Sequence, residues 1–234
     1  MDALAVEVLP NAEAVAARGA ELVASYVTQD LAIHETATLA LSGGRTPQRV
    51  LERLAVLELP WARIAVFQVD ERVAPRGHID RNRTHASAAL AEPLRRYTAS
   101  FRWMPVEEED LDAAAHRYAD ALRAAAGSPP ELGTVHLGLG PDGHTASLFP
   151  GSALISDAAR DVAVTEPQLR RRRMTLTLST LNRARRILWI VTGADKRAAL
   201  ARLVAGDTSI VGSHVRRAGA LLLADADAGA TIPR

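Results

Sequence analysis

Short apolar runs alternate along this chain with segments whose apolar residues recur at helical spacing. The runs typical of buried strands cover residues 4–9, 38–41, 64–69, 134–137, 174–178, 187–191 and 220–224. Helical spacing, with residues typical of helix starts, predicts helices that begin at Pro10-Asn11, at Thr46-Pro47, near Asn82, around Leu111 and at Lys196. Strands that alternate with helices form a largely parallel sheet covered on both faces. The sequence therefore predicts an α/β fold with three layers.

Length and charge limit the remaining possibilities. A chain of 234 residues, 48% of them hydrophobic, can bury a substantial core and fits one domain spanning residues 1–234 better than two small ones. The net charge of +1 leaves no basic excess for nucleic acid, and the one dense basic run, Arg170 to Arg173, has no interleaved aromatic residues. We therefore expect no nucleic-acid partner.

Cysteine is absent, which excludes disulfides and thiolate catalysis, and the seven histidines show no paired spacing such as HExxH. No metal site is therefore expected. The amino terminus carries Asp2 where a signal peptide would carry a base, and no apolar run approaches about 18 residues. We expect a soluble cytoplasmic protein that does not associate with membranes.

Two glycines follow the predicted strand 38–41, in the loop Ser42-Gly43-Gly44-Arg45. Glycine lets the backbone approach a ligand closely, and the helix that follows offers unpaired N–H groups and a positive dipole end, which together suit a phosphate. The alternative is an ordinary tight turn into a helix, with Thr46 as N-cap and Pro47 in the first turn. Both interpretations stay open from these residues alone.

Three charged residues, Asp70-Glu71-Arg72, follow the predicted strand 64–69 directly. Carboxylates in this place could act as acid or base, and Arg72 could bind an anion or hold a neighbouring carboxylate. The alternative is a strand that simply reaches solvent at its end.

The loop after the predicted strand 134–137 contains Gly138, Gly140, Asp142, Gly143 and His144. Ligands of α/β folds bind at the carboxyl edge of the sheet, where this loop would lie. Histidine titrates near neutral pH, so His144 could take a proton from water, and Asp142 could orient or stabilise its imidazole. The alternative is a histidine that caps a helix starting near Thr145.

Further candidates lie elsewhere in the chain. His136, inside the predicted strand, is interpreted as a core residue or as one that supports the site residues from outside the pocket. Lys196 opens a predicted helix, where its charge opposes the helix dipole, so a phosphate shared with the Gly43-Gly44 loop would explain its position; the alternative is a solvated lysine. Arg173 begins a strand and could also reach the pocket.

Together these segments resemble the 6-phosphogluconolactonase family, in the superfamily of glucosamine-6-phosphate isomerases and 6-phosphogluconolactonases. The resemblance runs from about residue 39 to residue 204 and is carried by residues 41–47, 69–72, 82, 137–150, 173–175 and 193–196. It implies a three-layer α/β/α sandwich with a mostly parallel, modified Rossmann-like sheet. The implied activity is hydrolysis of 6-phospho-D-glucono-1,5-lactone to 6-phosphogluconate, the second step of the oxidative pentose phosphate pathway, without a cofactor. We expect a monomer or a weak homo-oligomer.

The resemblance also implies roles for matching residues. His144, with Asp142, would be the catalytic pair, and His144 would be the general base that activates water. Water would attack the lactone carbonyl, and the ring oxygen would leave after protonation by the imidazolium. The residues expected to contact the substrate and its phosphate are Ser42, Gly43, Gly44, Arg45, Asp70, Arg72, Arg173 and Lys196.

The sequence departs from the family at two places. The family often has Ser-Asn where this chain has Arg81-Asn82, and residues 209–226 lack the prolines and the aromatic residue usual in its C-terminal segment.

Two other functions are alternatives to the lactonase. Glucosamine-6-phosphate isomerases and deaminases typically follow Asp-Gly-His with Ile-Ala-Phe-Asn-Glu-Pro, whereas residues 145–150 here are Thr-Ala-Ser-Leu-Phe-Pro and lack that carboxylate. A non-catalytic sugar-phosphate sensor would need a further module, for which the chain has no residues to spare.

Overall fold

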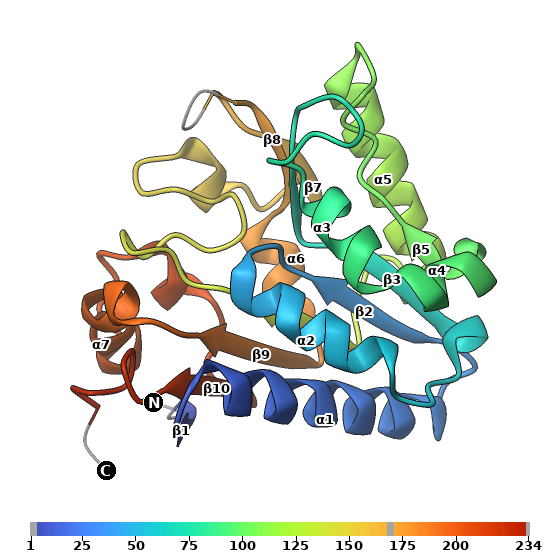
Figure 1. Ribbon diagram of the computed structural model, residues 1–234. Helices are drawn as coiled ribbons and strands as arrows, with labels where there is room; N and C mark the ends of the chain where they lie inside the picture. Colours follow the sequence, from blue (N-terminus) through green and yellow to red (C-terminus); the bar gives the residue numbers. More distant parts are fainter. Residues whose placement is uncertain (1–3, 168–170, 233–234) are drawn as a thin grey trace.

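A parallel β-sheet forms the centre of the computed structural model, which describes residues 4–167 and 171–232 (Figure 1). Within these residues the sheet has seven strands in the order β1-β10-β9-β6-β2-β3-β5, and every neighbouring pair is parallel. The strands are β1 (Ala5–Leu9), β2 (Ala37–Leu41), β3 (Ile64–Gln68), β5 (Phe101–Arg102), β6 (Thr134–Leu137), β9 (Arg186–Val191) and β10 (Ala220–Asp225). All carboxyl ends therefore meet at one edge.

Helices cover both faces of this sheet. One face packs against α1 (Ala12–Leu31) and α2 (Arg45–Ala55), and the other against α5 (Leu111–Ala126), α6 (Leu178–Arg183) and α7 (Arg197–Ala205). The short helices α3 (Asn82–Ala89) and α4 (Ala91–Arg96) connect the strands near the β5 edge. The predicted three-layer α/β fold is confirmed.

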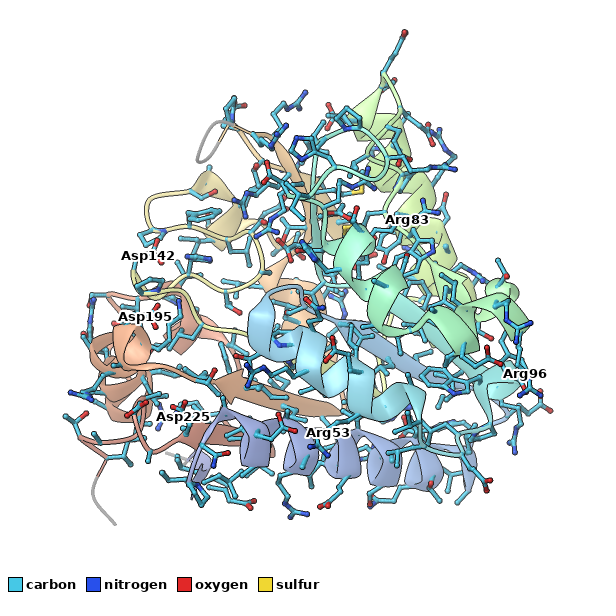
Figure 2. The ribbon with its side chains drawn as sticks, in the orientation of Figure 1. Arg53, Arg83, Arg96, Asp142, Asp195 and Asp225 are labelled. Carbon is cyan, nitrogen blue, oxygen red and sulfur yellow. The ribbon has the colours of Figure 1, made fainter. Side chains whose placement is uncertain are left out.

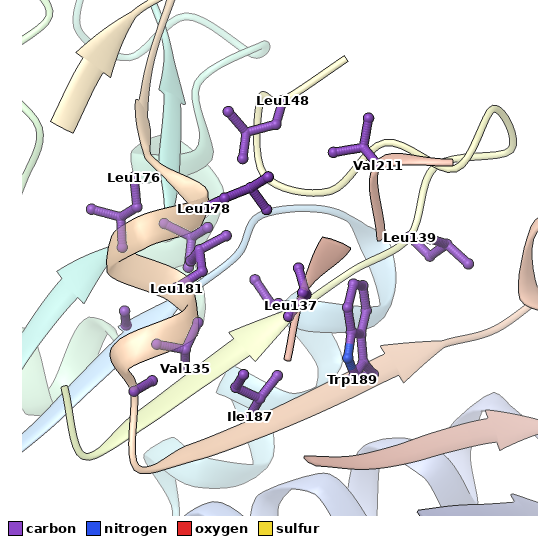
Figure 3. Packing of buried hydrophobic residues seen from close by; sticks show 14 of the residues in the cluster. Val135, Leu137, Leu139, Leu148, Leu176, Leu178, Leu181, Ile187, Trp189 and Val211 are labelled. Carbon is purple, nitrogen blue, oxygen red and sulfur yellow. The ribbon is translucent and has the colours of Figure 1, made fainter. Parts of the chain in front are cut away.

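Alternation along β9 explains why both faces need a cover. Ile187 and Trp189 point to the side of α6 and α7, where they belong to the same buried cluster as Leu137 and the leucines of α6 (Figure 3), while Leu188 and Ile190 join the core beneath α1 and α2. Each of these side chains is at most 2% exposed. Burial of one such side chain contributes about 1.5–3 kcal/mol, so the strand stabilises two cores at once.

A second, antiparallel sheet of three strands extends beyond the main one in the described part of the chain. It consists of β4 (Asp70–Arg72), β8 (Arg173–Leu176) and β7 (Val162–Val164), in that order. The chain passes from β3 into β4 through Val69, whose backbone N–H donates to Leu41 of the main sheet and whose carbonyl accepts from Leu176 of the small one. The sequence predicts a strand near β8, but neither its direction nor this sheet.

Several predicted boundaries are confirmed and some are wrong. Asn11 caps α1 as predicted, since its side chain accepts from the Ala14 N–H at 2.9 Å. Thr46 is not the N-cap of α2, because Gly44 occupies that position and the Thr46 hydroxyl pairs with Thr192 instead. No helix starts near Thr145, which forms an isolated β-bridge with Leu148. The alternative role of His144 as a helix cap is therefore wrong.

No helix in the described part of the chain is both long enough and apolar enough to span a membrane.

Candidate active site

The candidate site lies at the point in the sheet where the strand order changes direction. β2 and β6 are neighbours in the middle of the sheet, and later strands extend from β2 toward β5 on one side and from β6 toward β10 on the other. At such a switch point the loops that leave the two strands diverge and leave a crevice. A cavity of about 150 Å³ lies there.

Seven predicted site residues line this cavity: Ser42, Gly43, Asp70, Arg72, His144, Arg173 and Lys196. Gly44 lines an adjoining cavity of about 410 Å³, which shares Gly43 and Lys196 with the first. Asp142 is outside this lining but contacts His144. Arg45 begins α2, but its side chain lies outside the described part of the structure, as does the whole of Arg170.

The Gly43-Gly44 turn brings backbone to the cavity wall. A Cβ on Gly43 would lie 1.9 Å from the Asn82 side-chain oxygen, so only glycine fits. Gly44 has φ +119° and leads directly into the first turn of α2. The Ser42 hydroxyl donates to the His136 carbonyl at 2.9 Å, which ties this turn to β6. The amino-terminal turn of α2 therefore adjoins the cavity, as an anion site requires.

Lys196 reaches the same wall from the loop after β9. It ends a 3-10 turn, Ala194–Lys196, that precedes α7, and its Nζ lies 3.2 Å from Asp195 Oδ2. The loop is held by Asp225, whose carboxylate accepts from the Gly193 N–H. Figure 2 shows Asp195 beyond the end of β9. Lys196 is the only lysine among the 28 lysine and arginine residues of the chain. This count sets the residue apart as well, although the sequence prediction rested on its place at the start of a helix.

Asp70 and Arg72 come from β4 in the small sheet. The carboxylate of Asp70 accepts from the Ser147 hydroxyl at 2.5 Å and from Asn82 Nδ2 at 3.1 Å. The Arg72 guanidinium donates to Asn82 Oδ1 at 2.7 Å and to the Asp80 carbonyl at 3.0 Å. Both side chains are thus fixed in the cavity wall before any ligand binds.

Glu71, between them, points the other way and is fully buried. Its carboxylate accepts the backbone N–H groups of Asn82 and Arg83 at 2.8 Å each. It therefore caps the first turn of α3 and does not line the cavity.

His144 and Asp142 form the one close histidine–carboxylate pair in the cavity region of the described structure. Nδ1 of His144 lies 2.5 Å from Asp142 Oδ1, and the imidazole side chain is 24% exposed. Burial works to raise the pKa of Asp142, but hydrogen bonds and charge from His144 outweigh it, and the pKa is lowered. Gly140 permits the pair, because a Cβ there would lie 2.1 Å from His144 Nδ1.

An aromatic ring packs against the imidazole. The ring centroids of His144 and Phe149 are 4.4 Å apart, and the Arg173 guanidinium lies 5.2 Å from the Phe149 centroid. Arg173 is buried, which together with the charge of Arg72 lowers its pKa, although guanidinium stays protonated at any working pH. Of the arginines 171–173, Arg173 is the one that lines the cavity.

The remaining features are His136 and the cavity residues that the sequence did not assign to the site. His136 is fully buried and burial lowers its pKa to about 4, so the prediction of a core residue is confirmed. Within the described residues, neither of its ring nitrogens has a hydrogen-bond partner. Sequence reasoning did not assign Asn82, Ser147 and Phe149 to the site, although all three lie in the segments that carry the resemblance. Ala146, which also lines the cavity, has a left-handed φ of +53°.

Comparisons with known proteins show which family the chain resembles in sequence and fold. A sequence model described as glucosamine-6-phosphate isomerases/6-phosphogluconolactonase matches residues 10–221. The 6-phosphogluconolactonase of Synechocystis sp. is 35% identical over 86% of this chain and 85% of its own length, and that of Pseudomonas putida is 37% identical over 88% and 85%. The crystal structure of the 6-phosphogluconolactonase of Thermotoga maritima superimposes with a TM-score of 0.83 at 25% identity, covering 94% of this chain and 98% of that one.

Proposed function

This chain belongs to the glucosamine-6-phosphate isomerase/6-phosphogluconolactonase family, and we propose that within it the chain is a lactonase. Its reaction is the hydrolysis of 6-phospho-D-glucono-1,5-lactone to 6-phospho-D-gluconate in the oxidative pentose phosphate pathway. Relatives that carry the name 6-phosphogluconolactonase and cover most of both chains support this substrate.

One observation carries the choice between the two activities of the family. In the isomerase and deaminase motif Asp-Gly-His-Ile-Ala-Phe-Asn-Glu-Pro, the glutamate falls at position 149 of this chain. Here that position holds Phe149, whose ring packs 4.4 Å from the imidazole of His144. An apolar ring cannot take part in the proton transfers that open an amino sugar. The remaining carboxylate partner, Asp142, suits a histidine that activates water.

His144 acts as the general base in this proposal. Asp142 accepts from Nδ1–H, which leaves Nε2 as the nitrogen that takes the proton of the attacking water. The water oxygen adds to the lactone carbonyl carbon and forms a tetrahedral intermediate. Its collapse breaks the bond to the ring oxygen, which leaves as a hydroxyl after the imidazolium returns the proton. One histidine thus serves both proton transfers.

The phosphate binds at the other end of the substrate. The Gly43-Gly44 turn and the start of α2 supply N–H groups, and Lys196, Arg72 and Arg173 supply positive charge at the walls of the same cavities. Ser42, Arg45 and Asp70 complete the proposed substrate contacts. Binding energy from the phosphate positions the reactive ester against the activated water.

The family match over residues 10–221 supports one catalytic domain that spans the chain. We expect it to act as a monomer or a weak homo-oligomer in the cytoplasm, without nucleic acid.

A lactonase assay tests the proposal. The lactone is generated fresh, hydrolysis is coupled to oxidation of the 6-phosphogluconate formed, and the spontaneous rate in buffer is subtracted. Purified protein should exceed that rate severalfold at nanomolar concentration. A rate equal to buffer, with ammonia released from glucosamine 6-phosphate, would instead assign the deaminase activity. Binding of 6-phosphogluconate without either activity would indicate a sensor.

A further inference from the structure

A buried arginine that lies outside the cavity lining connects to the cavity through an ion pair with Glu71 and the hydrogen bonds that Glu71 accepts. Arg81 is 1% exposed, in the connection between β4 and α3. Its Nε lies 3.1 Å from Glu71 Oε2, and its Nη1 donates to Glu107 Oε1 at 2.9 Å and to the Ala74 carbonyl at 2.8 Å. Arg81 also stands where the family often has serine. A guanidinium that is desolvated this fully needs a reason beyond surface charge.

The first contact of Arg81 is the carboxylate that starts α3. Glu71 is fully buried and accepts the N–H groups of Asn82 and Arg83, as well as the Arg72 N–H at 2.8 Å. These bonds cap the first turn of α3 and fix the end of β4 against it. Arg81 is the cation that pairs with this carboxylate in the interior.

The residue fixed in this way is Asn82, whose side chain contacts three other residues of the cavity wall. Its Nδ2 donates to the Asp70 carbonyl at 2.9 Å, and its Oδ1 accepts from Arg72 Nη1 at 2.7 Å. Its side chain also lies against Gly43 so closely that no Cβ would fit there. A small movement of α3 would therefore disturb Arg72 and the phosphate turn together.

Stability alone does not explain the buried pair. Replacing a buried ion pair by apolar groups is often neutral or stabilising, whereas removing only one partner leaves an uncompensated charge. A buried carboxylate without its cation is relieved by protonation or by entry of water, and both would alter the bonds to Asn82 and Arg83. The pair is thus suited to hold geometry.

We propose that Arg81 is a positioning residue for substrate binding: paired with Glu71, it fixes the start of α3 so that Asn82 holds Arg72 at the cavity wall. The inference rests on the proposed function for its substrate. It predicts an effect on KM, because Arg72 binds the anion, and little effect on kcat, because His144, Asp142 and Phe149 lie on another loop.

The variants Arg81→Ser and Arg81→Lys test this against Arg76→Ser. Arg76 is an exposed arginine that also pairs with Glu107, at 3.7 Å, so the control removes a charge of the same type nearby. We expect KM for the lactone to rise about tenfold in Arg81→Ser, as for loss of roughly 1.4 kcal/mol of binding, with kcat within about twofold. Arg81→Lys should lie in between, and Arg76→Ser should match the wild type. Arg81→Lys keeps a cation in the interior, so it serves if Arg81→Ser does not fold.

A double variant tests the route through Arg72. Arg72→Met alone should raise KM, and adding Arg81→Ser should then raise it by clearly less than tenfold, because only the contact of Asn82 with the Gly43 turn is left to disturb. An unchanged KM in Arg81→Ser and Arg81→Lys, a fall in kcat at constant KM, or additive effects with Arg72→Met would each overturn the proposal.

Calorimetric titration with 6-phosphogluconate separates this inference from the proposed function. The Kd should rise about tenfold in Arg81→Ser and stay unchanged in Arg76→Ser, whether or not the protein hydrolyses the lactone. Lactonase activity in the wild type with equal Kd values in all variants would leave the function standing and refute the role of Arg81.

Discussion

Replacement of Phe149 by leucine should separate orientation of the catalytic histidine from stability of the fold. The ring is 6% exposed and lies between the imidazole of His144, at 4.4 Å, and the guanidinium of Arg173, at 5.2 Å. A shorter aliphatic side chain loses about 1 kcal/mol of packing, about 0.5–1.5 from the ring pair and up to about 2 from the cation. We therefore expect the free energy of unfolding to fall by about 1.5–4.5 kcal/mol.

Catalysis should fall as well. After the substitution the imidazole keeps its contact with Asp142 through Nδ1 but loses the ring against its face, and a displacement on the order of 1 Å can cost about a hundredfold in rate. We expect kcat to drop about 10- to 100-fold, equivalent to about 1.4–2.7 kcal/mol of activation free energy. KM should change less, and only through the lost contact between the ring and the guanidinium of Arg173.

Phe101→Leu is the matched control. Phe101 is also 6% exposed and also has two ring neighbours, Trp61 at 5.9 Å and Trp103 at 5.7 Å, but it lies on the edge strand β5 and not in the cavity lining. Urea unfolding should show similar losses in the two variants, whereas the coupled lactonase assay should show a lower kcat only for Phe149→Leu. Equal stability losses with equal kcat values would refute an orienting role for Phe149.

Three further predictions concern single side chains. His144→Ala should lower kcat about 10²- to 10⁴-fold with KM nearly unchanged in the lactonase assay, and a fully active variant would remove His144 as the base. Lys196→Ala should raise KM about tenfold or more. Lys196→Arg should raise KM severalfold, because a planar guanidinium does not replace a compact ammonium beside Asp195. Unchanged KM values in both variants would exclude a phosphate contact. Burial lowers the pKa of His136 to about 4, whereas the histidine of the unfolded chain takes up its proton near pH 6.5. The stability that the neutral His136 contributes is therefore fully present above pH 6.5. It should fall by up to about 3 kcal/mol as the pH is lowered to 4. His136→Leu should flatten that dependence in urea unfolding at pH 7 and pH 5, and equal slopes would contradict it.

The sequence predicted those parts of the fold that depend on residues close together in the chain. The strand at residues 134–137 and the cap at Asn11 follow from apolar runs and from a side chain that bonds three residues ahead. The small sheet was not predicted, because its strands are three or four residues long and β4 pairs with β8 across about a hundred positions of sequence. Thr46 has the right residue type for a cap, but a tertiary contact with Thr192 takes its hydroxyl.

The same limit applies to the candidate site. His144, Asp142 and the two glycines stand out because their residue types carry chemistry or backbone freedom. Asn82 and Ser147 do not, since an amide and a hydroxyl are common on any surface. The contact of Asn82 with Arg72 spans a loop of ten residues, and that of Ser147 with Asp70 joins segments that are distant in the sequence. Three-dimensional contact, and not residue type, identifies the side chains that hold others in place.

The charges around the cavity favour an anionic ligand on physical grounds alone. Arg72 and Arg173 are direct cross-strand partners in the antiparallel pair of β4 and β8, and like charges placed opposite each other destabilise such a pair. Both line the cavity, and Asp70, the nearby carboxylate in its wall, already accepts from Ser147 and Asn82. A phosphate between the arginines would relieve their repulsion and add charge-assisted hydrogen bonds. The repulsion that remains without ligand therefore contributes to binding, since it is removed only when the anion enters.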